Sequence, residues 1–442
     1  MSTTTPAAHG GAAKIHVETI ARVEGEGALH VRLKGGRIQD LKLEIPEPPR
    51  LFEAFLRGRR AEEAVDITAR ICGICPIAYQ MSATHAIERA WGIQIDPQVR
   101  ALRRLFYCGE WIESHALHIY FLHAPDFLGY QDALQMAVKF RPEVERALRL
   151  KKIGNEMMRV LGGREIHPVS VRVGGFYHVP SKSDLEPLVE QLTWALEASV
   201  ETARLVTTLP FPDFQQDYEF VSLSHPDEYP LNEGRVVSSR GIDLDVSEYE
   251  DHFLEQHVRH SNALHSVLRE RGSFHVGPLA RFNLNYEKLP AVAQETAREC
   301  KLEAPVRNPF RSIIVRAVEL VFACAEALRL IEQYEPPPQT WTPYERRAGT
   351  GMAATEAPRG LLYHRYTIDE NGLILASKIV PPTAQNLKRI EDDLWGYLPQ
   401  ILDAPVEEIT WRAEQAIRNY DPCISCATHC LKVRVEREDD IR

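Results

Sequence analysis

Apolar and polar residues alternate near the N-terminus and then change to a helical spacing. The alternation covers Lys14–Ile20, Ala28–Leu33 and Ile38–Ile45, with Gly35-Gly36 as a turn between the last two. Beyond residue 51, apolar residues recur at i, i+3 and i+4 as far as about residue 130. The pattern predicts a small antiparallel sheet followed by helices.

The rest of the chain also contains both strand-like and helical patterns, and the helical pattern covers most of it. Residues 360–380 alternate around Glu370-Asn371-Gly372, which predicts a second hairpin. Helical spacing continues in seven further segments: 132–161, 183–207, 246–271, 287–301, 308–334, 383–400 and 404–418. We therefore expect a mainly α protein with small antiparallel β elements.

Nothing in the chain resembles a repeat or a long linker. The best linker candidate, Glu335–Pro338, is short. We expect a mobile tail over residues 1–13, a single domain over 14–429 and a C-terminal extension over 430–442. One domain is favoured because two cysteine pairs, described next, must meet if they share a metal.

The eight cysteines are too sparse for a disulfide scaffold in a chain of 442 residues. Four form the pairs Cys72/Cys75 and Cys423/Cys426, and the others stand alone. Two Cys-x-x-Cys pairs supply four thiolates, a set compatible with zinc, an iron–sulfur cluster or nickel. Zinc ribbons usually separate their pairs by about 15–20 residues, whereas here most of the chain intervenes. Spacing alone leaves the metal open.

The composition limits the classes of partner and the cellular locations that we expect for this chain. A formal net charge of −10 argues against a broad nucleic-acid surface, because phosphate binding needs basic side chains. No apolar run is long enough for a membrane span. The N-terminus lacks the apolar stretch of a secretory signal, so we expect a cytoplasmic protein.

The sequence around both cysteine pairs is distinctive. The first pair lies in RICGICPIAYQMSATHAIERAWG and the second in DPCISCATH. Further landmarks are RVEGEG, HPVSVRVGGF, HVGPLARFN, EAPRG and VPPTAQN. Together they resemble the large, catalytic subunit of nickel–iron hydrogenases over essentially the whole chain. The resemblance implies reversible cleavage of dihydrogen to protons and electrons.

The resemblance implies a role for each cysteine of the two pairs. Cys72 and Cys423 would be terminal nickel ligands, while Cys75 and Cys426 would bridge nickel to iron. The iron would also carry carbon monoxide and cyanide. Thiolates suit the task because they stabilise nickel in changing oxidation states.

Three other residues match positions around that centre. Arg359 of EAPRG and Thr383 of VPPTAQN would face the diatomic ligands, with Arg359 also assisting catalysis. Glu24 of RVEGEG would relay the proton that Cys423 receives, a general acid–base role. Outside the motifs, such an arginine would more often form a surface ion pair, and Glu24 would be an ordinary strand-end carboxylate.

The resemblance also implies a magnesium ion. Glu53 and His429 match its ligands, with the backbone carbonyl of Ile379 as a weaker third. Magnesium prefers oxygen ligands, so a histidine there rests on the resemblance alone.

Two residues differ from those of many family members and indicate which branch of the family the chain resembles. Tyr79 and Ser114 replace the His and Asp of many respiratory members. Tyr79 favours the cytoplasmic, cofactor-coupled branch, in which electrons pass through an iron–sulfur small subunit to flavin and NAD(P)-binding diaphorase subunits. Because the chain has no G-x-G-x-x-G at a strand-to-helix turn, iron–sulfur clusters, flavin and NAD(P) would lie on partners.

The residues after His429 resemble an extension that a maturation protease removes after metallochaperones deliver the metals. Cys430 would then be discarded, although a simple charged terminus is an alternative. Two other interpretations of the chain stay open here: a metal-free core subunit related to respiratory complexes, and a structural zinc protein.

Overall fold

The computed structural model describes residues 13–34 and 37–428. His429, the predicted extension over 430–442 and nearly all of the predicted tail lie outside the described residues. Residue 13 already belongs to the first strand. The division into tail, domain and extension therefore stays a prediction.

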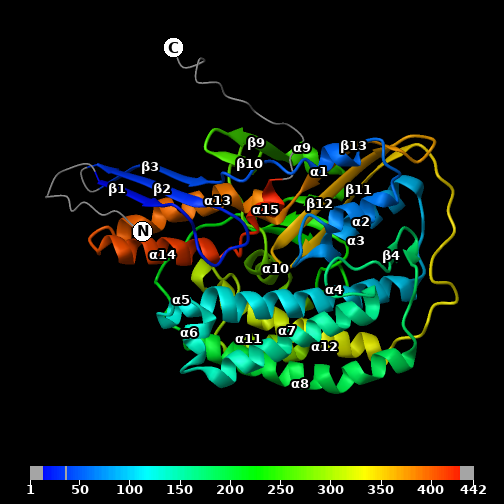
Figure 1. The fold of residues 1–442 in the computed structure, drawn as a ribbon, viewed down its shortest axis with the longest axis horizontal. Coiled ribbons are helices and arrows are strands. Elements are labelled where there is room, and N and C mark those ends of the chain that lie inside the picture. The colour runs from blue at the N-terminus through cyan, green and yellow to red at the C-terminus, as the bar shows by residue number, and fades with distance from the viewer. Residues whose placement is uncertain (1–12, 35–36, 429–442) are drawn as a thin grey trace, which may run out of the picture.

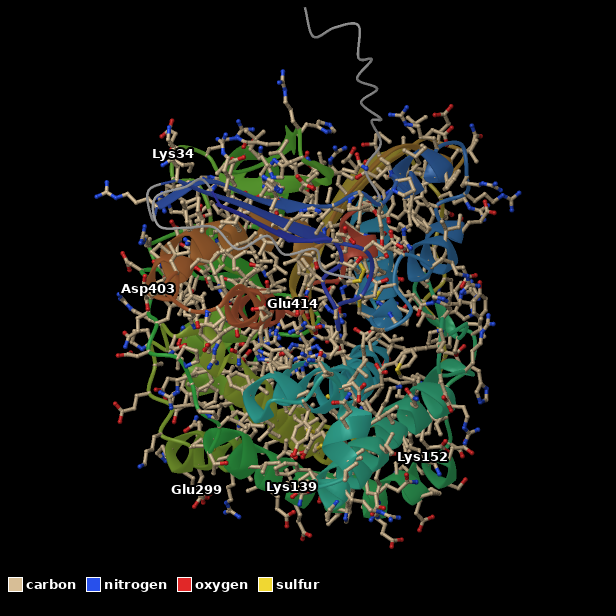
Figure 2. All side chains as sticks on the ribbon, turned by 60° about the vertical axis from the view of Figure 1, so that its left-hand side comes forward. Lys34, Lys139, Lys152, Glu299, Asp403 and Glu414 are labelled. Carbon is tan, nitrogen blue, oxygen red and sulfur yellow. A yellow bond between two sulfur atoms is a disulfide. The ribbon has the colours of Figure 1, made fainter. Side chains whose placement is uncertain are left out.

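Long helices form one layer of the molecule (Figure 1). They pack against one another through apolar faces, and their buried apolar residues belong to the largest core cluster of the molecule. The layer contains α4 (Pro97–Leu117), α7 (Arg141–Gly162), α8 (Lys182–Thr207) and α12 (Ser312–Glu332), with the shorter α5 (Ala124–Leu128), α6 (Ala133–Ala137), α10 (Pro278–Asn285) and α11 (Ala291–Glu299) beside them. Figure 2 places Lys139, Lys152 and Glu299 on the outer side of this layer.

Small antiparallel sheets lie across the other half of the molecule (Figure 1). Their strands are β1 (Ala13–Val17), β2 (Ala28–Lys34) and β3 (Arg37–Glu44); β4 (Val171–Arg172) and β5 (Gly175–Phe176); β6 (Val221–Ser224), β7 (Arg235–Ser238) and β8 (Asp243–Leu244); β9 (Phe253–Val258) and β10 (Ser261–Leu268); β11 (Gly349–Ala357), β12 (Gly360–Ile368) and β13 (Ile374–Val380). The predicted mainly α fold with small antiparallel elements is confirmed.

The remaining helices connect these sheets. Helix α3 packs on β11 and β12, and α13 packs on β3 and β10. They are α1 (Phe52–Leu56), α2 (Glu63–Ala69), α3 (Pro76–Trp91), α9 (Tyr249–His252), α13 (Pro382–Tyr397), α14 (Val406–Arg418) and α15 (Ile424–Ala427). Within the described residues, no helix is long and apolar enough to cross a membrane.

Two helix predictions need correction. The helix expected over 246–271 is instead a short turn of helix followed by the β9–β10 hairpin. Burial alternates along β10, which is the period of a half-buried strand rather than of a helix. The helix expected over 132–161 is broken into α6 and α7, since α7 starts at Arg141 with a proline in its first turn, a position that proline favours.

Candidate metal centre

The first cysteine pair lies at the start of α3. Cys75 immediately precedes the helix, and Pro76 occupies its first turn, where the missing N–H costs nothing. The backbone N–H of Cys75 donates to the sulfur of Cys72 at 3.2 Å, and the Cys75 sulfur lies 2.7 Å from the same atom. Both sulfurs are buried, with at most 4% of each residue exposed. The local fold therefore directs both sulfurs to one point.

A buried carboxyl group supports this helix start. The side chain of Glu110, on α4, accepts hydrogen bonds from the backbone N–H groups of Ile77 and Ala78 at 2.6 and 3.3 Å. These are among the helix N–H groups that have no partner within the helix. Burial raises the pKa of Glu110 well above its ordinary value, against the lowering effect of the Ile77 N–H. Sequence reasoning missed Glu110; its lone charge in an apolar stretch of α4 was the signal.

The second cysteine pair comes from the other end of the described chain. Cys423 precedes the four-residue helix α15, and its sulfur lies 3.9 Å from that of Cys72. The sulfurs of Cys72, Cys75 and Cys426 form one candidate ligand group, and Glu24, Cys423 and Cys426 form another. The predicted convergence of the two pairs in the core is confirmed by these distances. In Figure 1, α15 lies near the middle of the molecule.

One detail differs from the expectation of four free thiols. The sulfurs of Cys423 and Cys426 are bonded to each other as a disulfide. The physical reason is that both side chains are directed to the same buried spot. To serve as metal ligands, both would have to be reduced thiolates, because the thiolate is the form that binds a metal.

The sulfurs of the first pair differ in their acidity. Burial works to raise the pKa of Cys72, but the hydrogen bond from Cys75 and the charge of Arg359 bring that pKa below its ordinary value. Burial and the neighbouring Cys72 raise the pKa of Cys75 well above its usual range. Four buried cysteine sulfurs beside the Arg359 cation match the ligand set of a soft, thiolate-bound metal.

Glu24 touches the sulfur of Cys423. The sulfur lies 2.9 Å from Oε2 of Glu24, to which it can donate once Cys423 is a reduced thiol, and the backbone N–H of Ile424 donates to the carbonyl of Glu24 at 2.8 Å. The neighbouring Gly25 has φ +89°, and an added Cβ would lie 2.9 Å from the Cβ of Ile424. Only glycine fits there, so the RVEGEG motif brings the N-terminal segment against α15.

Arg359 is buried beside the first pair. Its Nη1 lies 3.9 Å from the sulfur of Cys75, and its Nε donates to the carbonyl oxygen of Asp421 at 2.7 Å. A second contact, of 3.2 Å, joins Nη2 to the Asp421 carboxylate. Burial works against the charge, but Asp421 and the sulfurs raise the pKa of Arg359 above its ordinary value. Asp421 was not predicted; its place in the Asp-Pro-Cys motif was the available signal.

Buried contacts also fix the backbone on either side of this site. The hydroxyl of Thr383 accepts the backbone N–H of Cys423 at 3.0 Å. The guanidinium of Arg281 donates to the backbone carbonyls of Ala357 and Pro358 at 2.8 and 2.9 Å, immediately before Arg359. The landmark motifs therefore contact one another around the sulfurs.

The predicted magnesium ligands form a separate group. The backbone N–H of Ile379 donates to the Glu53 carboxylate at 2.8 Å, so these two residues do meet. Burial raises the pKa of Glu53 to about 7, against the effect of that N–H. His429 lies outside the described residues, but the carbonyl of the preceding Thr428 accepts the N–H of Arg50 at 2.6 Å, close to the start of α1.

The two residues that depart from the respiratory pattern are both buried. The hydroxyls of Tyr79 and Ser114 have no hydrogen-bond partner among the residues the structure describes. Burial raises the pKa of Tyr79 well above its ordinary value, which keeps its hydroxyl neutral. The ring lies 5.8 Å from that of His364.

The fold and its buried sulfurs define a candidate metal-binding protein whose centre uses cysteines from two distant segments. A family model described as nickel-dependent hydrogenase matches residues 50–144 and 270–429. The chain belongs to the nickel-dependent hydrogenase family.

Individual relatives agree with this assignment. The chain is 34% identical to sulfhydrogenase 1 subunit alpha of Pyrococcus furiosus, over 95% of this chain and 98% of that protein. It is 27% identical to the NAD-reducing hydrogenase HoxS subunit beta of Cupriavidus necator, covering 95% of each chain. A crystal structure of an NAD+-reducing [NiFe]-hydrogenase in the H2-reduced state matches with TM-score 0.87 and 25% identity, covering 94% of this chain and 99% of the other.

Proposed function

We propose that this chain is the catalytic large subunit of a nickel–iron hydrogenase that reversibly cleaves dihydrogen to protons and electrons. The observation that carries the proposal is the meeting of both cysteine pairs beside Glu24 in one buried pocket. Cys72 and Cys423 would be terminal nickel ligands, and Cys75 and Cys426 would bridge nickel to iron. When bound, such a metal centre provides the chemistry for heterolytic cleavage of dihydrogen.

The chain's own groups offer a path for the proton. A proton received at the sulfur of Cys423 can pass to Oε2 of Glu24 across 2.9 Å, which is a hydrogen-bonding distance to sulfur. Glu24 is only partly buried, so it can exchange that proton with groups closer to solvent. This is the geometry that a general acid–base residue needs.

Arg359 and Thr383 also contact the cysteines of the centre. The guanidinium of Arg359 is held by Asp421, so its charge and N–H groups point at the sulfurs without costly reorganisation. Thr383 fixes the backbone of Cys423. We propose that both face carbon monoxide and cyanide ligands of the iron, and that these ligands need the dry pocket formed here.

We also propose that Glu53, the carbonyl of Ile379 and His429 bind a magnesium ion. The contact between Glu53 and Ile379 supports a shared site, and magnesium prefers oxygen ligands such as these two. Removal of residues 430–442 by a maturation protease, after metallochaperones deliver the metals, is part of the same proposal.

For electron transfer, we propose an iron–sulfur small subunit, followed by flavin and NAD(P)-binding diaphorase subunits. Both the sulfhydrogenase relative and the HoxS relative are named as subunits of larger enzymes. The name of the second one specifies NAD reduction. We expect the complex in the cytoplasm, where NAD(P) is available.

Copurification of this chain with its partners tests the proposal. We expect about one nickel and one iron per chain beyond the iron of the small-subunit clusters, infrared bands of metal-bound carbon monoxide and cyanide, and hydrogen-dependent reduction of NAD(P)+. The separated subunit should not reduce NAD(P)+. Zinc alone at the cysteines would favour the structural zinc alternative, and a chain without metal would favour the respiratory-complex alternative.

A further inference from the structure

A second group of metal-binding side chains lies away from the cysteines, where the β9–β10 hairpin meets α13 (Figure 1). His260 is in the turn of the hairpin, His265 is on β10, and Glu391 is on α13. Nε2 of His260 lies 2.7 Å from Oε1 of Glu391, and Nδ1 of His265 lies 4.0 Å from Oε2. One ligand atom from each residue falls within 4.8 Å of the other two.

His265 is the unusual member of this group. It is 1% exposed, and neither of its ring nitrogens has a hydrogen-bond partner among the residues that the structure describes. A buried polar group without a partner is costly, and native proteins rarely leave one. Burial also lowers the pKa of His265 to about 4, so the ring is neutral at pH 7. Neutral imidazole is the form that coordinates a metal.

We propose that His260, His265 and Glu391 bind a divalent ion of the zinc class, separate from the nickel–iron centre. Two imidazole nitrogens and one carboxylate oxygen form a known three-ligand set for zinc, with water in the fourth position. Tetrahedral ligands at zinc distances are about 3.3 Å apart. The observed separations of 2.7 and 4.0 Å bracket that value, so small side-chain rotations form the site.

The surroundings are compatible with a cation. Oε1 of Glu391 accepts the backbone N–H of Leu43 on β3 at 3.1 Å, which holds the carboxylate in place. Lys388, whose charge lowers the pKa of His265, is 2.5 Å from the carboxylate of Asp392, which offsets that charge. His260 is partly exposed, so an ion and its water can enter from solvent.

An ion at this position would join the β9–β10 hairpin to α13, two segments that are distant in the sequence. Glu391 of α13 also accepts the backbone N–H of Leu43, so β3 is held at the same point. The first turn of α13 carries Thr383, whose hydroxyl supports the backbone of Cys423. The ion is therefore a structural brace on the helix that supports the cysteine centre, and it takes no part in the reaction.

Metal analysis of the purified complex tests this site. We expect one zinc per chain in the wild type after dialysis, and its loss in His265→Gln, with nickel and iron content unchanged. The matched control is His257→Gln, an exposed histidine on β9, which should retain the zinc. Equal zinc in His265→Gln and the wild type, or no zinc in the wild type after incubation with Zn²⁺, would overturn the proposal.

Cobalt binding covers the case in which the His265 variant does not fold. We expect Co²⁺ added to the zinc-stripped complex to give the weak visible bands of nitrogen and oxygen ligands, without the stronger bands of thiolate ligands. Glu391→Gln should lose these bands. Their absence in the wild type would mean that the three side chains form only an ion pair. Because nickel and iron are measured in the same samples, a failure of the hydrogenase proposal would be seen separately.

Discussion

The two cysteine pairs reach the same point by different means. The first begins the 16-residue helix α3, and its geometry is fixed mainly by that helix and by a sulfur that accepts a backbone N–H, while Glu110 of α4 adds support from another helix. In the second pair, Cys423 precedes a helix of four residues and Cys426 lies within it, and the pair is held by groups from far along the chain. These groups are Glu24, Thr383 and Arg359; the last holds the backbone at Asp421 and also lies 3.9 Å from the sulfur of Cys75 in the first pair.

The difference separates a locally ordered half of the site from a half ordered by long-range contacts. An isolated helix of one turn is not stable by itself, so α15 depends on its neighbours. Changes to those neighbours should affect the second pair far more than the first. The following predictions test this contrast.

Loss of a ligand from the locally ordered pair should have the largest effect. Cys72→Ser replaces a soft thiolate by a hydroxyl, so we expect nickel retention to fall at least ~100-fold, with no measurable hydrogen uptake. Metal content and hydrogenase assays on the purified complex measure both. Cys108→Ser, at a buried cysteine remote from the sulfurs, should keep its nickel. An active, nickel-loaded Cys72→Ser enzyme would remove this residue from the ligand set.

Glu24→Gln should separate metal binding from proton transfer at the second pair. The amide keeps the size of the side chain but cannot relay a proton. We expect activity to fall by roughly 10²–10⁴-fold, with nickel and iron retained. Hydrogen–deuterium exchange catalysed by the complex measures the proton step directly. Glu26→Gln, on the exposed neighbour, is the control and should be near wild type. Full exchange activity in Glu24→Gln would rule out the relay.

Arg359→Lys should reduce turnover while leaving the metals bound. Lysine keeps the charge but cannot contact both Asp421 and the sulfur side as the planar guanidinium does. We expect a loss of about 10²-fold in turnover, the scale for removing one oriented donor, and shifted infrared bands of the iron ligands. Arg365→Lys, on strand β12 that follows Arg359, is the comparison. Unshifted bands would show that Arg359 does not face those ligands.

Thr383→Val should reduce the stability of the segment that carries the second cysteine pair, and should leave the first pair unaffected. It leaves the buried N–H of Cys423 without its acceptor, which costs about 1–3 kcal/mol. Thermal unfolding and the rate of nickel loss on incubation with a chelator measure the effect. Thr383→Ser restores the hydroxyl and should recover most of the loss. Equal behaviour of the valine and serine variants would mean that the hydroxyl is unimportant.

The smallest effect is expected at Tyr79, within the helix of the first pair. Its hydroxyl has no hydrogen-bond partner among the described residues, so Tyr79→Phe should be neutral or stabilising by up to about 1 kcal/mol. Denaturant unfolding measures stability, and the hydrogenase assay should stay within about twofold of wild type. A large loss of activity would instead indicate that this hydroxyl takes part in the reaction.

The sequence predicted much of the fold because its periodicity was strong. Strands β1–β3, the β12–β13 hairpin and helix α8 agree closely with the expected segments. The β9–β10 hairpin was missed because the apolar positions of a short amphipathic strand pair also fit a helical spacing. Strand β11 was missed because small residues give it little alternation.

The sequence predicted the cysteines of the site but not all of the carboxylates around them, and the reason is physical. Motif spacing identified the sulfurs, but no local pattern could show which carboxylates meet Arg359 or α3. Asp421 adopts φ +49°, a conformation that is uncommon for residues other than glycine. Its pairing with Arg359, like that of Glu110 with Ile77, depends on tertiary contacts between distant segments.

The contact between Glu24 and Cys423 has a consequence for biosynthesis. The two residues are separated by nearly the whole chain, yet their backbones are hydrogen-bonded side by side. Glu24 is synthesised 399 residues before Cys423, so the N-terminal segment leaves the ribosome well before its neighbour exists. The four sulfurs can come together only after Cys423 has been synthesised and released from the ribosome, so a metal held by all four must be inserted after that point.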